Sequence, residues 1–349
     1  MNPLTIVSFH NAAEEWVGWS PITHLVHLAA TLLDAERIEL NPSRVGRIDG
    51  LKACLHPRSR SGAGGLLVIA KSPANARSFL ASQTSKKPFR FRAIWIIDSF
   101  WHEWMPTRQE MAYFDFIAYT QPGDQPYYEK AFGHRAHMLS WGSDVLNLGS
   151  CAHDRPIDLL RVGRQPAAWD DDALTQRLCS NHGIHFEGRP PYGHDPVDQH
   201  VRVMAYYART KFVIAHSNLA SAANYTHPSR EYITGRWTDA LACGATVAGV
   251  QPRAAALLFW PGATLDLPRA DLADNLVELK HQLSCWTPAV VVYNFHQACR
   301  LLDWRWRMKT IVDFFNITAP RLEHELVHLA QQLPPSTLAS ELSESLPVR

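Results

Sequence analysis

Short apolar runs alternate along the chain with longer stretches in which apolar residues recur at helical spacing. The run Leu4–Phe9 predicts a buried strand, and Pro21–Leu33 carries its apolar residues at the spacing of one helical face. The other elements expected in the first half are strands at Leu66–Ala70, Ala93–Ile97, Phe114–Tyr119 and Ala136–Trp141, and a helix at Asn75–Ala81. This alternation favours a mostly parallel sheet with helices on both faces.

The alternation restarts after a polar segment at Ser143–Asp154. The expected strands are Ile157–Val162, Ile184–Glu187, Phe212–Ala215, Thr246–Val250 and Ala263–Leu267, and the expected helices are Asp172–Asn181, Val197–Ala208, Arg236–Ala242, Leu272–Leu283, Cys299–Phe315 and Pro320–Gln332. The pattern predicts an α/β fold of two tandem, doubly wound, Rossmann-like domains. We expect a first domain over residues 1–148, a second over 149–298, C-terminal helices over 299–333 that pack back on the first domain, and a mobile tail over 334–349.

Composition narrows the classes of protein that fit this pattern. The 349 residues suit two domains, and 46% hydrophobic with 19% charged residues argues against disorder. Lys plus Arg is 34 and Asp plus Glu is 33, which gives a net charge of +1. The chain is therefore not expected to bind nucleic acid through its overall charge. Six cysteines without a CxxC pair indicate neither a disulfide scaffold nor a zinc ribbon. No apolar run has the length of a membrane span, and the N-terminus does not resemble a signal peptide, so a cytoplasmic protein is expected.

Two basic stretches in the first half, His56–Gly65 and Lys86–Arg92, have two interpretations. Solvated loops are the ordinary one. The other is a basic patch that binds phosphate-bearing acceptors or anionic lipid. A cytoplasmic protein with such a patch could also bind the surface of a membrane.

The segment His227–Gly249 carries the most chemical information. It holds two acids, Glu231 and Asp239, and a helix-like run that leads to the small residues ALACG. Free backbone amides and the dipole at a helix start favour an anion, so a diphosphate could bind there. The two acids would then accept hydrogen bonds from sugar hydroxyls, while Arg230 and Arg236 supply guanidinium groups that suit phosphate oxygens.

These residues resemble a known family. Glu231-x7-Asp239 followed by ALACGATVAG is similar to the E-x7-E motif and small-residue helix of group-1 glycosyltransferases of the GT-B fold. Arg236 matches the family branch with the pattern S-R-x-F-E-A-L-A. LLRVGRQ, ending at Gln165, resembles the V-G-R strand end that opens the donor domain, and MLSWGSD, ending at Asp144, resembles the hinge strand. Asp239 stands where the family has its second Glu, and Tyr232–Gly235 replaces the family's Phe-Gly.

The resemblance implies two Rossmann-like domains that face each other across a cleft. It implies an enzyme that moves a sugar from a nucleotide-diphosphate sugar to an unidentified acceptor with retention of anomeric configuration. Glu231 would contact the donor sugar, Asp239 the ribose, and Arg164 and Arg236 the leaving diphosphate. The full donor-binding set is Arg164, Arg230, Glu231, Thr234, Gly235, Arg236 and Asp239. GT-B enzymes generally need no bound metal, so neither a metal nor another bound cofactor is expected.

The first domain should supply the acceptor site beyond the carboxyl ends of its strands. The candidates are His10, Asp98, Trp101 and His102. In an inverting enzyme Asp98 or His102 could act as a general base, whereas in a retaining enzyme they would orient the acceptor or the sugar. The sequence leaves open whether the acceptor is a glycan, a lipid-linked molecule, a protein, a nucleic acid or a small molecule.

Two other functions fit parts of the sequence. His324-Glu325-x-x-His328 matches the H-E-x-x-H signature of zinc metalloproteases, which would make the chain a zinc-dependent hydrolase. A third ligand would have to come from elsewhere, and the leucines of this segment form an ordinary amphipathic stripe that favours a packing helix. The second alternative is a non-catalytic protein that binds nucleotide sugars or glycans on the same fold.

Overall fold

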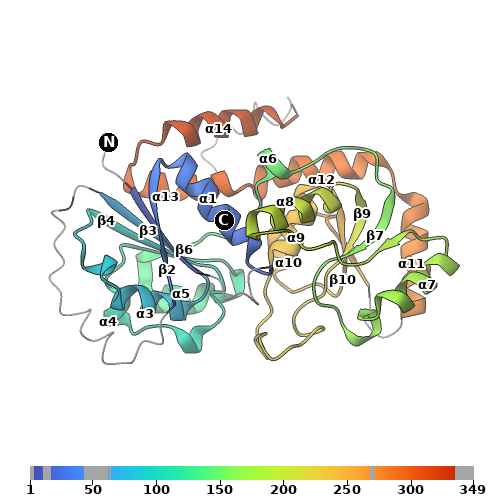
Figure 1. Cartoon of the computed structure of the whole chain (residues 1–349), viewed down its shortest axis with the longest axis horizontal. Helices are drawn as coiled ribbons and strands as arrows, with labels where there is room; N and C mark the ends of the chain where they lie inside the picture. The colour runs from blue at the N-terminus through green and yellow to red at the C-terminus, as the bar shows by residue number, and fades with distance from the viewer. Residues whose placement is uncertain (1–3, 11–16, 43–61, 63, 268–271, 335–349) are drawn as a thin grey trace. The chain divides into compact units, whose positions relative to one another are not determined.

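The computed structural model describes residues 4–10, 17–42, 62, 64–267 and 272–334 (Figure 1). These residues fall into two compact units. The first contains the chain up to Trp141 together with Arg307–Arg321, and the second contains Gly142–Trp306 together with the chain from Leu322 onward. Each unit is built on one parallel sheet.

The sheet of the first unit has six strands in the order β2-β1-β3-β4-β5-β6. The strands are β1 (Leu4–Phe9), β2 (Ala35–Leu40), β3 (Gly65–Ala70), β4 (Phe91–Ile96), β5 (Phe116–Tyr119) and β6 (Ala136–Met138). The helices are α1 (Ser20–Leu32), α3 (Pro73–Ala81), α4 (Arg108–Met111), α5 (Gln125–Phe132) and most of α13 (Trp304–Phe315). Every strand pairs in parallel with its neighbours, so all carboxyl ends lie at one edge.

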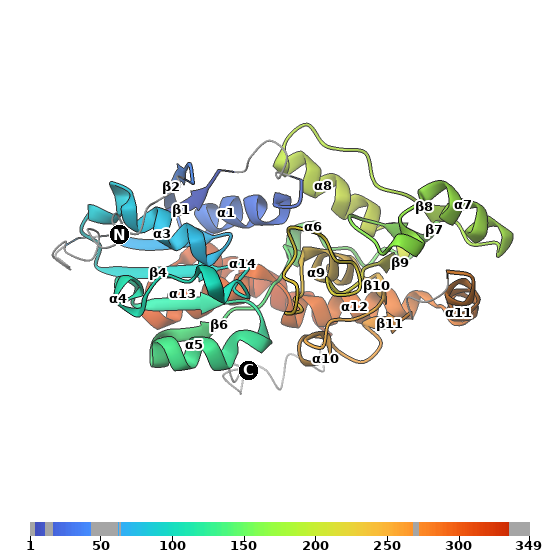
Figure 2. The ribbon, with the colours of Figure 1, turned by 90° about the horizontal axis from the view of Figure 1, so that it is seen from below.

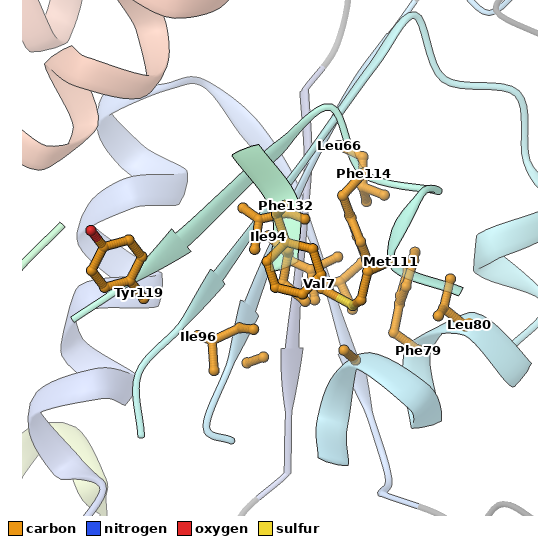
Figure 3. Close-up of a cluster of buried hydrophobic side chains, with 14 of the residues drawn as sticks. Val7, Leu66, Phe79, Leu80, Ile94, Ile96, Met111, Phe114, Tyr119 and Phe132 are labelled. Carbon is orange, nitrogen blue, oxygen red and sulfur yellow. The ribbon is translucent and has the colours of Figure 1, made fainter. Parts of the chain in front are cut away.

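Aromatic and aliphatic side chains fill both faces of this sheet. On one face, residues such as Val7 and Ile94 pack against α3, α4 and α5 through Phe79, Met111 and Phe132 (Figure 3). Side chains alternate between faces along a strand, so Phe91 and Phe116 point the other way from Ile94 and Ile117. There Phe315 of α13 stacks on Phe91 at 4.4 Å between ring centroids, and Phe314 meets Phe116 edge-on at 5.0 Å. Helix α13 therefore covers the second face.

The sheet of the second unit has five strands in the order β11-β10-β9-β7-β8, again all parallel. The strands are β7 (Ile157–Arg161), β8 (Phe186–Glu187), β9 (Thr210–Ile214), β10 (Thr246–Gly249) and β11 (Thr264–Asp266). The helices are α6 (Val145–Leu148), α7 (Asp172–Asn181), α8 (Pro196–Tyr207), α9 (Gly235–Ala242), α10 (Ala255–Leu258), α11 (Leu272–Cys285) and α12 (Pro288–Leu301), and α14 (Pro320–Gln331) spans the last unit boundary. Helices α7 and α11 pack on the sheet through one apolar cluster that includes Leu159 and Phe212, and α9 lies against β10 and α12 (Figure 2).

Most of the expected elements are confirmed. Strand Leu4–Phe9 and helix Asp172–Asn181 have the predicted bounds, and the side chain of Asp171 caps that helix by accepting from the N–H of Leu174 at 2.9 Å. The other expected strands occur with shifted ends. Strand β2 and helix α5 were not expected. Strand β2 reads AERIEL and has no buried position. Helix α5 has only 8 residues, although its Tyr128 and Phe132 are buried one helical turn apart.

The single helix expected over Cys299–Phe315 is wrong. The chain instead forms α12 and α13 with a break at Leu302 and Asp303. At the break, the N–H of Ser143 donates to the carbonyl of Leu302 at 2.9 Å, and the N–H of Trp304 donates to the carbonyl of Ser143 at 3.0 Å. These backbone groups are therefore used for pairing with a distant segment, and the helical ladder stops.

Arg305 reinforces this join inside the second unit. Its buried guanidinium pairs with Asp144 at 2.8 Å, with Asp303 at 2.9 Å and with Glu325 of α14 at 2.6 Å. Some regions discussed above lie outside the described residues, namely most of the basic stretch His56–Gly65 and nearly all of the tail. The five cysteines in the described part of the chain have free thiols. No helix in that part is long and apolar enough to span a bilayer.

Candidate functional site

The carboxyl edge of the second sheet gathers three residues of the predicted donor site. Strands β7, β9 and β10 are neighbours and run in parallel, so the loops after them meet at this edge. Arg164 follows β7, and Arg236 is the second residue of α9. Glu231 contacts residues that follow β9 and β10. Ligands of open parallel sheets bind at such an edge, next to the point where the strand order reverses.

Glu231 is a fixed carboxylate that solvent still reaches. Its Oε1 accepts a hydrogen bond from the hydroxyl of Ser217 at 2.7 Å, and its Oε2 lies 3.4 Å from the N–H of Arg253 and 3.7 Å from the Arg253 Nε. The side chain is 19% exposed. Further lone pairs of this carboxylate can accept hydrogen bonds from ligand hydroxyls.

Arg164 and Arg236 form a site of concentrated positive charge. Arg236 donates from Nη1 to the carbonyls of Val162 at 3.3 Å and of Arg164 at 2.9 Å. Arg164 donates to the hydroxyl of Ser221 at 3.1 Å, and its guanidinium lies 5.2 Å from the ring centroid of Tyr225. Burial and, after it, the positive charge of Arg164 lower the pKa of Arg236. Within the described residues neither arginine pairs with a carboxylate, so an anion would relieve this repulsion.

The start of α9 adds hydrogen-bond donors to the same place. Thr234 is the N-cap residue with an extended backbone, but its side chain makes no capping bond, and its buried Oγ1 has no hydrogen-bond partner within the described chain. Gly235 is the first helical residue. The helix ends at Ala242, and Gly244, two residues further on, has a φ of +76° that suits glycine. The amides of the first turn and the helix dipole favour a negatively charged ligand.

Arg230 and Asp239 lie differently from the residues above. Arg230 bonds to the ring of His227, with 2.9 Å between Nη1 and Nε2. Asp239 is 3% exposed, and its Oδ1 accepts from the hydroxyl of Ser143 at 2.6 Å. Burial raises the pKa of Asp239 to about 7; the Ser143 bond opposes this rise, and Asp144 adds to it. The structure therefore brings Glu231, Arg164, Arg236 and the start of α9 to the exposed edge, while Asp239 faces the chain at Ser143.

In the first unit, Asp98 and His102 follow β4 at the carboxyl edge of the sheet. His102 Nε2 lies 2.8 Å from Oδ1 of Asp124, and the hydroxyl of Ser99 donates to Oδ2 of Asp124 at 2.6 Å. Burial, followed by the charge of Asp124, raises the pKa of Asp98 to about 8. Asp124 was not found from the sequence, because it lies in a separate loop and no motif contains it. Asp124 holds the ring of His102, which the sequence predicts as an acceptor-side residue.

The other two acceptor-side candidates are surface residues of the first unit. The indole of Trp101 stacks on that of Trp104 at 4.0 Å and an angle of 6°, and Trp104 is 43% exposed. The side chain of His10 is 60% exposed and lies 3.5 Å from Glu39. Trp101 is therefore part of an aromatic platform. His10 follows β1, and the strand order places β3 between β1 and β4.

The H-E-x-x-H segment lies on α14 as an ordinary helix. The rings of His324 and His328 are 4.2 Å apart, but the Nε of Arg305 donates to the carboxylate of Glu325 at 2.6 Å. In the part of the chain that the structure describes, no group of three or more His, Cys, Asp and Glu side chains could hold a metal ion. Glu325 thus joins the structural ion-pair network described above.

One residue at the carboxyl edge of the second sheet was missed from the sequence. His216 follows β9, is 2% exposed, and accepts a hydrogen bond at Nδ1 from the N–H of Val250 at 3.0 Å. Burial and then the charge of Arg236 lower its pKa to about 4, so the ring is neutral at physiological pH. No local pattern distinguishes it among 18 histidines.

Comparison with known proteins supports the fold. No protein-family model matches the chain, and no curated protein matches it in sequence. The crystal structure of Anabaena HepE in complex with UDP and glucose superposes with a TM-score of 0.51 at 11% identity, covering 89% of this chain and 99% of HepE. HepE in complex with UDP gives 0.50 at 10% identity, covering 90% and 99%. A UDP-GlcNAc 2-epimerase from Methanocaldococcus jannaschii gives 0.41 at 8% identity, covering 80% and 92%. The fold is α/β of the GT-B type, with two Rossmann-like units.

Proposed function

We propose that this protein is a glycosyltransferase that moves a sugar from a nucleotide-diphosphate sugar to an acceptor. The observation that carries this proposal is the pair of guanidinium groups of Arg164 and Arg236, which have no carboxylate partner within the described residues. They lie at the carboxyl edge of the second sheet, beside the amide end of α9. Two such cations and a helix start suit the two phosphates of a nucleoside diphosphate.

Each residue of this edge has a role in the transfer. Arg164, Arg236 and the first amides of α9, from Gly235, neutralise the charge that grows on the leaving diphosphate as the glycosidic bond breaks. Loss of one such contact costs on the order of 3 kcal/mol of transition-state stabilisation. Glu231 accepts hydrogen bonds from hydroxyls of the donor sugar. Asp239 would bind the ribose only after its bond to Ser143 opens.

The first unit holds the acceptor in this proposal. Its hydroxyl is oriented by Asp98 and His102, and Trp101 contributes an apolar surface. We propose retention of the anomeric configuration, in which these residues position the acceptor. With inversion, His102, held by Asp124, would instead remove the proton of the attacking hydroxyl. The arginines supply the positive charge that a metal would otherwise provide, so we propose transfer without a bound metal.

Calorimetric titration with nucleoside diphosphates tests the donor site. UDP and UDP-glucose come first because HepE was solved with UDP and glucose, and GDP, ADP, CDP and dTDP complete the panel. We expect micromolar to millimolar binding of one nucleotide, and at least a tenfold loss of affinity in Arg236→Ala. Arg202→Ala is the matched control, because the side chain of this arginine on α8 is 42% exposed and, among the described residues, its ion-pair partner is Asp198. If the wild type binds none of the panel, or if Arg236→Ala binds equally well, the proposal is wrong.

Turnover then separates an enzyme from a binding protein. Release of nucleoside diphosphate from the bound donor, first with water and then with sugar, lipid-linked and peptide acceptors, measures transfer. Nuclear magnetic resonance of the first product gives its anomeric configuration, and a chelator tests whether a metal is required. Tight donor binding with no turnover on any acceptor would favour the non-catalytic alternative.

A further inference from the structure

A histidine at the carboxyl edge of the second sheet holds a proton that has no acceptor among the described residues. Nδ1 of His216 accepts a hydrogen bond from the N–H of Val250, so in the neutral ring the proton is on Nε2. The residue is 2% exposed, and within the described chain its Nε2 has no hydrogen-bond partner. Buried donors are almost always paired, so an unpaired one calls for an explanation.

The register of the sheet places this ring beside the arginine site. Ile214 pairs with Arg161 of β7 on one side and with Ala248 of β10 on the other. Two residues further on, His216 therefore lies between the loop that follows β7 and the end of β10. The first of these loops carries Gly163 and Arg164.

The same loop holds the guanidinium of Arg236. The carbonyls of Val162 and Arg164 accept from Arg236, and a Cβ built on Gly163 would lie 3.4 Å from Arg236 Cδ. The ring of His216 and the Arg236 side chain thus border the same loop. The charge of Arg236 acts on His216, as expected for close neighbours.

The end of β10 is shaped to admit this ring. Gly249 has a φ of +146°, and a Cβ there would lie 2.2 Å from the carbonyl oxygen of Ala215 and 3.2 Å from Nδ1 of His216. Any other residue would push the ring and its strand away. The ring position therefore depends on a glycine with a backbone conformation that side chains rarely adopt.

We propose that His216 is a further ligand-binding residue of the donor site, whose Nε2–H donates a hydrogen bond to a phosphate oxygen of the bound nucleoside diphosphate. This inference rests on the proposed function. A neutral N–H directs an oxygen atom without adding a third positive charge beside Arg164 and Arg236. The arginines provide most of the attraction for the anion, and His216 fixes the orientation of one phosphate.

A buried water molecule is the competing explanation for the unpaired proton. The Oε1 of Gln165 is also buried without a partner in the described chain, and its Nε2 donates to the carbonyl of Ile214 at 3.2 Å. A water that accepts from His216 and donates to Gln165 would satisfy both groups. In that case His216 would matter for stability and not for nucleotide binding.

Two substitutions separate these explanations. His216→Asn keeps an acceptor near the position of Nδ1 and removes the donor at Nε2, whereas His216→Gln places an amide donor near Nε2. We expect His216→Asn to weaken UDP binding by about 10- to 100-fold and His216→Gln to stay within a few-fold of wild type. Binding of uridine, which lacks phosphate, should be the same in all three proteins. His185→Asn, on an exposed histidine of the same unit, is the control.

The possible results distinguish a failure of this inference from a failure of the proposed function. Equal UDP affinity of wild type and His216→Asn overturns the inference and leaves the proposed function in place, whereas a wild type that binds no nucleoside diphosphate overturns both. Nitrogen-15 resonances of the wild-type histidines give a second measurement that needs no variant. The His216 Nε2–H signal should shift when UDP binds, and a signal that UDP leaves unchanged contradicts the inference.

Discussion

Substitution of Asp239 by Asn tests how the second unit holds its buried acid. The carboxyl is 3% exposed, and burial raises its pKa from 3.8 to about 7. On folding it therefore takes up a proton at any pH between these two values. The stability of the wild type consequently falls as the pH rises from about 4 to about 7, and the penalty is complete above pH 7. The Asn side chain can still accept from Ser143, but it does not titrate.

The size of the effect follows from the shift. Three pKa units at about 1.4 kcal/mol each give at most about 4 kcal/mol of unfolding free energy. Between pH 5 and pH 8 we expect Asp239→Asn to gain about 3 kcal/mol relative to wild type. The gain appears only as the pH increases, because at low pH the wild-type carboxyl is neutral as well.

Urea unfolding followed by tryptophan fluorescence measures this difference at several pH values. Asp198→Asn is a control with no pH dependence in this range, because hydrogen bonds from the N–H of His194 and from Arg202 lower the pKa of Asp198 from its ordinary value of 3.8. The Asp198 carboxyl is therefore ionised in the folded and the unfolded state between pH 5 and pH 8, and the difference between this variant and wild type should stay constant there. A difference between Asp239→Asn and wild type that stays constant from pH 5 to pH 8 would refute the argument, because it would mean that Asp239 is solvated or compensated by a cation.

Three further outcomes follow from the structure. Arg305→Met leaves the buried carboxylates of Asp144 and Asp303 without their cation. The free energy of unfolding, measured by urea titration, should fall by about 3–5 kcal/mol. A loss under about 1 kcal/mol would mean that this ion-pair network does not stabilise the fold. Gly249→Ala forces a methyl group to within 2.2 Å of the carbonyl oxygen of Ala215 and should cost at least about 2 kcal/mol, visible as a lower Tm, whereas an unchanged Tm would show that the strand can shift. Asp124→Asn removes the charge that contributes to the raised pKa of Asp98, so carbon-13 titration should give a pKa below about 8 but above 3.8; an unchanged value would mean that burial alone is responsible.

The strands and most helices could be predicted because their signals are local. A strand such as Leu4–Phe9 is buried on both faces of a parallel sheet. Such a strand needs apolar residues at nearly every position, so the signal lies in consecutive residues. Strand β2 carries no such run, because it lies at the edge of its sheet with many exposed positions. The break between α12 and α13 was also hidden, since it depends on backbone pairing with Ser143, far away in the chain.

The same division holds for the candidate site. The motif around Glu231 and Arg236 pointed to the carboxyl edge of the second sheet, because the residues that favour an anion stand close together in sequence at a helix start. Asp239 accepts a hydrogen bond from Ser143, which is 96 positions away, and its other carboxylate oxygen lies 4.0 Å from Nδ1 of His200. No pattern near any of these residues predicts the contacts. Asp124 fixes His102 from another loop in the same manner.

The sequence by itself determined the α/β pattern, the two Rossmann-like units and the charged helix start, since periodic burial and helix termini are encoded in neighbouring residues. Only the tertiary structure decided which acid faces solvent, which arginines have no carboxylate partner among the described residues, and that Nε2 of His216 has no hydrogen-bond partner there. His216 illustrates the reason. Its environment comes from the register of three strands and from the missing side chain of Gly249, and distances between segments become defined only when the sheet has formed.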